Sequence, residues 1–138
     1  MMDVSQISFV AIVLAVLANM IIGALWYSPV LFANVWMKSL GKTAEELHTS
    51  NANIGYGLTT LAGIATAIIL SLFISMLESV TIGGGALIGF LAGAGIASAR
   101  ELSPTFFEGR KYTLFFISAG YHIVSLTVMG IIIAFFIK

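Results

Sequence analysis

The chain has 138 residues, of which 59% are hydrophobic and only 9% are charged, and its formal net charge is zero. Soluble domains carry about a quarter charged residues, so this composition excludes an ordinary soluble domain and predicts an integral membrane protein. Zero net charge argues against a nucleic-acid partner, which requires a basic surface. With no cysteine in the chain, disulfides, thiolate metal sites and cysteine catalysis are excluded as well.

Four apolar segments are long enough to cross a bilayer, since a spanning helix needs roughly 20 such residues. In chain order they cover residues 7–27, 54–77, 80–99 and 112–137. We expect a single domain over residues 1–138, an all-α integral membrane bundle of four transmembrane helices. Pro29 should end the first span, because the residue before a proline avoids helical geometry. The charged pair Arg100 and Glu101 is expected to end the third.

The connection after the first span predicts a short helix that lies in the membrane interface. Its apolar residues share one helical face: Leu31, Phe32, Val35, Trp36 and Leu40. Thr43 and Glu46 have capping-box spacing and predict a further helical turn. In the connection before the fourth span, Ser103 and Pro104 are typical of an N-cap and a first helical residue.

Basic residues concentrate in two of the connections, residues 28–53 and 100–111. These are Lys38, Lys42, Arg100, Arg110 and Lys111. On the opposite side the sequence has only Lys138 and the terminal amine. The positive-inside rule therefore places both connections on the cytoplasmic side of the cytoplasmic (inner) membrane and both termini on its outer side. An aromatic belt at the same interface agrees with this orientation: Trp26, Tyr27, Trp36, Tyr56 and Tyr112.

Small residues recur every four positions in three of the predicted spans. The third span has Gly85, Gly89, Gly93 and Ala97; the second includes Gly55 and Gly63; the first has Ala11, Ala15, Asn19 and Gly23. Such stripes allow close helix approach and predict a tight bundle. The spacing leaves open whether they pack within one chain or between copies. Four helices enclose little interior, and we therefore expect a homo-oligomer in the lipid bilayer.

His122 is an ionisable residue well inside the fourth span. It lies ten residues past Tyr112, or roughly 15 Å along a helix, near the middle of a hydrocarbon layer about 30 Å thick. Asn19 reaches a similar depth, so we predict an Asn19–His122 hydrogen bond. Ser118 and Ser125 share the face of His122, and Tyr121 adjoins it.

Two interpretations of this intramembrane polar group are open. Ionisable residues inside membranes often mark solute or proton pathways, which would make His122 a proton-handling or substrate-binding group. Alternatively, a neutral histidine bonded to Asn19 or a serine holds two helices together. No Asp or Glu is expected mid-span, which separates the chain from small multidrug exporters and their membrane-embedded glutamate. The only other histidine, His48, lies in a connection, and we predict no metal site and no cofactor.

Charged and aromatic residues gather at the expected cytoplasmic interface: Trp26, Tyr27, Arg100, Glu108 and Arg110. They are interpreted either as headgroup and topology contacts or as a polar mouth that leads toward His122. Arg100 would pair with Glu108 if the connection folds back.

Two stretches of the chain, residues 23–41 and 106–130, resemble a bacterial membrane family, domain-of-unknown-function family 1761. Matches to the first family motif are Gly23, Trp26, Tyr27, Pro29, Phe32, Trp36 and Met37. Those to the second are Phe107, Glu108, Arg110, Gly120, Tyr121, His122, Met129 and Gly130. The chain departs at Ala33, where glycine is usual, and at Ser118, where asparagine is usual. The resemblance implies four spans and no activity, and it favours a shared site that includes Trp26, Tyr27, Glu108, Arg110 and His122.

Three functions compete on the sequence alone. The first is an oligomeric channel or transporter for a small solute, with His122, Asn19 and Tyr121 near the path. The second is a structural or accessory subunit that binds another membrane protein through Gly89 and Gly93. The third is a membrane enzyme acting on lipid or quinone, with Glu108, Arg110 and His122 together at the cytoplasmic interface. It has the least support, because neither a second base nor a nucleophile is evident.

Overall fold

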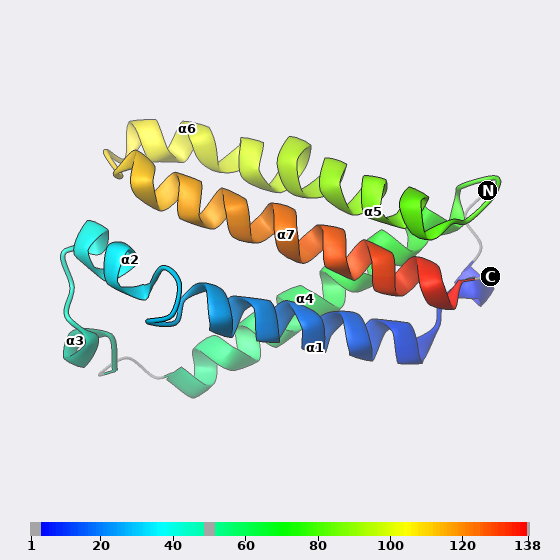
Figure 1. Ribbon diagram of the computed structural model, residues 1–138, viewed down its shortest axis with the longest axis horizontal. Coiled ribbons are helices and arrows are strands. Elements are labelled where there is room, and N and C mark those ends of the chain that lie inside the picture. Colours follow the sequence, from blue (N-terminus) through cyan, green and yellow to red (C-terminus); the bar gives the residue numbers. More distant parts are fainter. Residues whose placement is uncertain (1–3, 49–51, 138) are drawn as a thin grey trace.

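The computed structural model describes residues 4–48 and 52–137, and in these ranges the chain forms helices joined by short turns (Figure 1). Four helices are long and apolar enough to cross a membrane. They are α1 (Phe9–Trp26), α4 (Ala52–Ser75), a composite third helix (Ile82–Phe107) and α7 (Tyr112–Phe136). The predicted all-α bundle of four spans is confirmed. Lys138, which enters the charge count above, lies outside the described residues.

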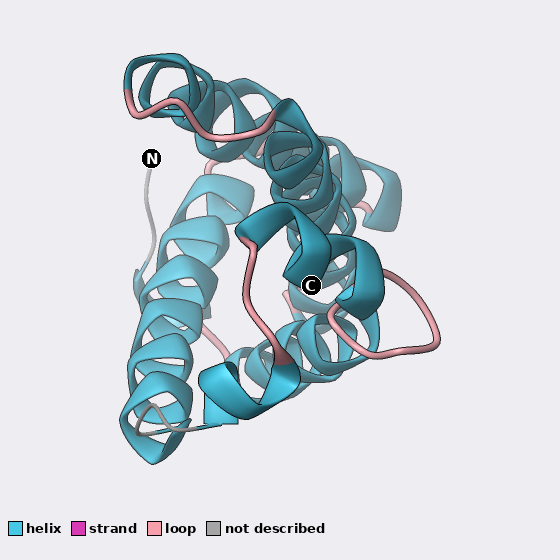
Figure 2. Ribbon diagram, turned by 90° about the vertical axis from the view of Figure 1, so that its left-hand side faces the viewer, coloured by secondary structure: helices cyan, strands magenta, loops and turns pink. Residues whose placement is uncertain are grey.

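The central element of the bundle is α7, which packs against α1, α4 and the third helix. Figure 1 shows α1 along one side of α7, the third helix along the other, and α4 crossing diagonally. The connections after α1 and before α7 lie at one end of the bundle, together with α2 and α3, and Figure 2 looks onto this end. We call it the α2–α3 end. The turn between α4 and the third helix lies at the other end, as four successive spans require.

Most of the apolar surface of the four helices faces outward. Within the most apolar 18 residues of each span, between 22% and 33% are buried inside the structure. Large side chains such as Phe9, Leu58 and Phe116 are more than half exposed. Water would not tolerate so much contiguous apolar surface, whereas a bilayer solvates it.

Local sequence signals set the helix ends. Ser8 caps α1 by accepting a hydrogen bond from the backbone N–H of Ala11 at 3.2 Å. The helix then stops at Trp26, three residues before Pro29, as predicted. Thr81 caps the third helix by accepting from the N–H of Gly84 at 2.9 Å.

The glycine stripe of the third helix packs within the chain, against α7. A methyl group added at Gly85 would collide with the carbonyl oxygen of Gly130, and one at Gly89 with that of Leu126. At Gly93 the added carbon would lie 2.8 Å from the carbonyl oxygen of His122. The two backbones are therefore in direct contact over about two turns, so this stripe packs within one chain.

The small-residue stripe of the second span, α4, has different surroundings at its two glycines. A side chain at Gly63 would contact Asn19 and Val16 on α1, and Gly63 is buried. Gly55, near the start of α4, has no neighbour within 4 Å of such a carbon. Only the inner part of this stripe thus takes part in the packing of the bundle.

The short helix predicted after the first span is present as α2 (Ala33–Leu40), and a further turn, α3 (Ala44–His48), follows. Ala33 is buried, and α2 packs against α7. Thr43 accepts from the N–H of Glu46 at 3.2 Å, as the capping-box spacing predicts. The position of α2 in a membrane interface stays a prediction.

The predicted end of the third span is wrong. The helix does not stop at Arg100 and Glu101 but continues to Phe107. Pro104, predicted to begin a helix, lies inside α6 (Ala99–Phe107). A charged residue ends an apolar run without ending a helix, and Pro104 removes only one backbone donor. The chain turns instead at Gly109, whose φ of 67° favours glycine.

Candidate functional site

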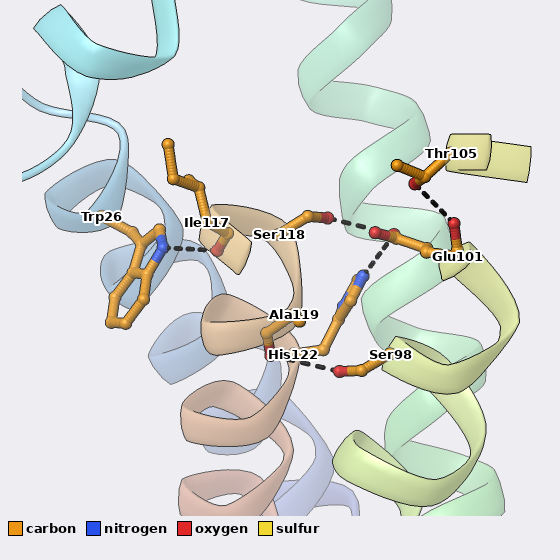
Figure 3. A network of polar contacts seen from close by, with 8 residues as sticks. All are labelled: Trp26, Ser98, Glu101, Thr105, Ile117, Ser118, Ala119 and His122. Carbon is orange, nitrogen blue, oxygen red and sulfur yellow. Dashed lines mark hydrogen bonds and ion pairs between the residues drawn. The ribbon is translucent and has the colours of Figure 1, made fainter. Parts of the chain in front are cut away.

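The polar centre of the bundle joins the third helix to α7 (Figure 3). One carboxylate oxygen of Glu101, Oε1, lies 2.8 Å from Nε2 of His122 and accepts a hydrogen bond from the Ser118 hydroxyl at 3.0 Å. The side chains of His122 and Glu101 are 28% and 36% exposed. Sequence reasoning placed His122 in the span correctly but assigned Glu101 to a connection.

A π-helical segment, η2 (Ala92–Ser98), keeps the third helix facing α7 on the way to Glu101. Gly85, Gly89 and Gly93 face α7 at four-residue steps, whereas the next buried contact is Ser98, five residues on. Five residues of an α-helix would overshoot a full turn by about 140°, but i→i+5 bonding makes five residues close to one turn. Ser98 therefore faces α7 and donates to the carbonyl of Ala119 at 3.2 Å. Glu101 follows on the same side.

Asn19 forms a separate polar group between α1 and α7. Its side-chain oxygen accepts from the Tyr121 hydroxyl at 2.7 Å and from the Ser125 hydroxyl. The predicted Asn19–His122 hydrogen bond is therefore wrong, although the two helices are neighbours as it required. Tyr121 and Ser125 take the amide, because His122 points around α7 toward the third helix, where the Glu101 carboxylate is the stronger acceptor.

A cavity of about 250 Å³ opens beside Glu101 toward the α2–α3 end. Its lining comes from the residue after α1, from α2 and α6, from the turn before α7 and from the first turns of α7. The lining residues are Tyr27, Trp36, Leu40, Glu101, Thr105, Arg110, Leu114, Phe115 and Ser118. His122 is not among the lining residues and lies one helical turn beyond Ser118. The Glu101–His122 pair therefore has access to the cavity through Glu101.

The five residues predicted to form a polar mouth have different surroundings. Tyr27 and Arg110 line the cavity. The carboxylate of Glu108 pairs with the Arg110 guanidinium at 2.5 Å in an exposed ion pair, so the predicted Arg100–Glu108 pair is wrong. The sequence distance explains the error: Glu108 and Arg110 flank the tight turn at Gly109, whereas Arg100 lies two helical turns away and is exposed.

Trp26 is turned away from the cavity and has a packing contact instead. Its indole N–H donates to the backbone carbonyl of Ile117 at 2.8 Å (Figure 3). A side-chain carbon at Gly120 would come within 2.8 Å of the Trp26 ring, so glycine is required beneath it. Gly23 likewise faces the hydroxyl of Tyr121. The two motif-bearing stretches of the chain thus pack on each other, which gives several motif residues a structural role.

Tyr27, which follows α1, has a perturbed hydroxyl. Burial raises the pKa of Tyr27 above its ordinary value, a hydrogen bond with Ser118 lowers it, and the neighbouring Tyr121 and Glu101 raise it further. The net direction is upward, so the phenol stays protonated at neutral pH and is available as a hydrogen-bond donor in the cavity.

Within the described ranges, no three His, Asp or Glu side chains come together in a metal-binding arrangement. Glu101 and His122 form a contact between two titratable side chains. If the carboxylate is ionised, Nε2 must carry the hydrogen between them, because a carboxylate only accepts.

Glu101 is the site residue that the sequence reasoning missed. The small-residue stripe gives only a partial signal for it. Glu101 lies at the four-residue spacing of Gly85, Gly89 and Gly93, but the contact with α7 passes through Ser98 instead of Ala97, because the π-helical segment lengthens one step to five residues.

The model of a family of proteins of unknown function, DUF1761, matches residues 10–134, and the chain belongs to this family. Neither the curated proteins nor the solved structures contain a match.

Proposed function

We propose that this DUF1761 protein is a transport protein that couples the movement of a small solute to protons, with Glu101 and His122 as its proton-binding centre. The observation that carries the proposal is the position of Glu101 inside a spanning helix, bonded to His122 and facing a cavity. Ionisable residues inside spans are costly and usually mark ion, proton or substrate pathways.

The depth of the pair supports this role. The third helix is 26 residues long, or about 39 Å at 1.5 Å per residue, and it exceeds a hydrocarbon layer of about 30 Å by a few ångströms at each end. Glu101 lies six residues before its end at Phe107, about 9 Å along the axis. The backbone of Glu101 is therefore a few ångströms inside the apolar layer, and its side chain extends to His122. A solute from the adjoining water can reach the carboxylate through the cavity.

The structure gives less support to the competing functions. An accessory subunit that binds through Gly89 and Gly93 would need a free stripe, but these glycines are in contact with α7. An enzyme with Glu108, Arg110 and His122 in one centre would need them together, whereas Glu108 pairs with Arg110 and His122 with Glu101.

Proteoliposomes that contain a pH-sensitive dye would test the proposal. We expect wild-type vesicles to change their internal pH when one class of a panel of small cations, anions and zwitterions is added, beyond the change in protein-free vesicles. Glu101→Gln should slow this change at least about tenfold, because positioned proton-transfer groups typically contribute large factors. Glu78→Gln, an exposed glutamate at the opposite end, is the control and should behave as wild type. If no class gives a protein-dependent change, or if Glu101→Gln equals wild type, the proposal is wrong.

We further infer that the protein lies in a bacterial inner membrane. From the distribution of Lys and Arg we infer that the cavity opens toward the cytoplasm. The cysteine-free chain allows a direct test with Glu45→Cys in α3 and Ser79→Cys in the turn after α4, both exposed. In intact cells an impermeant maleimide should label the Ser79 variant and spare the Glu45 variant until the membrane is opened. The reverse pattern would invert the orientation.

A further inference from the structure

Two side chains that can carry charge line the cavity, Glu101 and Arg110, and their partners differ. Arg110 is already paired with Glu108 at 2.5 Å, and both side chains are more than half exposed. Glu101, in contrast, has a hydroxyl and an imidazole as its partners, and among the described residues no Lys or Arg pairs with it. The innermost charged group of the cavity is therefore a carboxylate without a permanent cationic partner.

The walls around this carboxylate are aromatic. Tyr27, Trp36 and Phe115 line the cavity, and the rings of Tyr27 and Trp36 lie 5.2 Å apart in an edge-on arrangement. Aromatic faces attract organic cations by cation–π interaction. The volume of about 250 Å³ is below the range of roughly 300–1,000 Å³ typical of pockets for drug-sized ligands, so the occupant must be small.

From this combination we infer that the cavity binds a small organic ammonium ion, with its charged nitrogen at Glu101 and its apolar part against Tyr27, Trp36 and Phe115. The inference rests on the proposed function, because it names the solute class of the same site. If Arg110 were the recognition group instead, the ligand would carry the opposite charge, as a carboxylate does.

Three probes of similar shape separate these cases: benzylammonium, neutral benzyl alcohol and anionic benzoate. Their binding to the full chain in a neutral detergent can be measured by calorimetry, with protein-free micelles as the blank. We expect benzylammonium to bind at least about tenfold more tightly than benzyl alcohol, because a hydrogen bond to a charged group adds that much. Benzoate should bind most weakly.

Variants assign the preference to its residues. Glu101→Gln should remove most of the difference between benzylammonium and benzyl alcohol, and Glu78→Gln should keep it. Trp36→Leu should weaken benzylammonium by a few-fold, in line with the loss of one cation–π contact. If Glu101→Gln does not give a monodisperse protein, the three probes on wild type still decide the charge preference.

Equal affinity for the three probes, tighter binding of benzoate, or an unchanged preference in Glu101→Gln would overturn the inference. These outcomes are separable from the transport test. Glu101-dependent pH changes driven by anions alone would leave transport standing and remove the ammonium ligand. Glu101-dependent benzylammonium binding without any pH change would keep the ligand and remove the coupled transport.

Discussion

Replacing Gly89 by alanine is expected to destabilise the protein by about 3 kcal/mol, the upper part of the usual range for overpacking. The added methyl group would meet the backbone of α7 at Leu126 and Thr127 rather than the end of a flexible side chain. A backbone cannot move aside locally, so the third helix and α7 must separate along their length. In thermal unfolding of the detergent-solubilised protein we expect Tm to fall by about 10 °C.

Gly83→Ala is the matched control for this substitution. Gly83 lies in the same helix, six residues earlier, and a methyl group there has no neighbour within 4 Å. Its Tm should stay equal or rise slightly, because alanine favours helix over glycine by roughly 0.5–1 kcal/mol. Equal decreases in the two variants would show that the close contact between the third helix and α7 does not stabilise the bundle.

The fold followed from the sequence because bilayer thickness sets the length of each apolar segment. The first and fourth spans, predicted at residues 7–27 and 112–137, are observed at Phe9–Trp26 and Tyr112–Phe136. The prediction of the third span was wrong at one end only. The hydropathy pattern records where the apolar residues stop, but the hydrogen bonds of a helix do not require apolar side chains. Helix length beyond the apolar layer is therefore invisible to that pattern.

The site was predicted in part, and the missing part depends on helix pairing. His122 was identified because an imidazole in an apolar run is unusual, and that signal is local. Its partner is not local: both Asn19 and Glu101 reach its depth, and only the packing of the third helix on α7 selects Glu101. Chain order does not specify this packing, whereas the contacts of Gly85, Gly89 and Gly93 do.

The glycine stripe of the third helix and the Glu101–His122 pair depend on the same helix–helix contact. Gly93 lies against the backbone of His122, and Glu101 follows two turns later on the same helix. The close approach that glycine permits brings the carboxylate within hydrogen-bond distance of the imidazole. Substitutions in the stripe are therefore expected to impair the pair without touching either partner, which distinguishes this site from polar groups on independently packed helices.

A double-mutant cycle between Glu101 and His122 is the most direct test of the pair. We compare the free energies of unfolding of Glu101→Ala, His122→Ala and the double variant in the same detergent. The expected coupling energy is about 1–2 kcal/mol, because hydrogen bonds to charged groups contribute about 1.5–3 kcal/mol and membrane-embedded bonds measure less. The partial exposure of both side chains, 28% and 36%, reduces it further.

The sign of the coupling energy shows whether the two side chains stabilise each other. Each single variant leaves one partner without its bond, so the double variant should lose less than the sum of the two. The control cycle pairs His122→Ala with Glu78→Ala at the opposite end of the bundle, where the effects should add within about 0.5 kcal/mol. A Glu101–His122 coupling as small as that of the control would mean that the contact does not stabilise the bundle. The placement of Glu101 in the span would then have to be explained by a function alone.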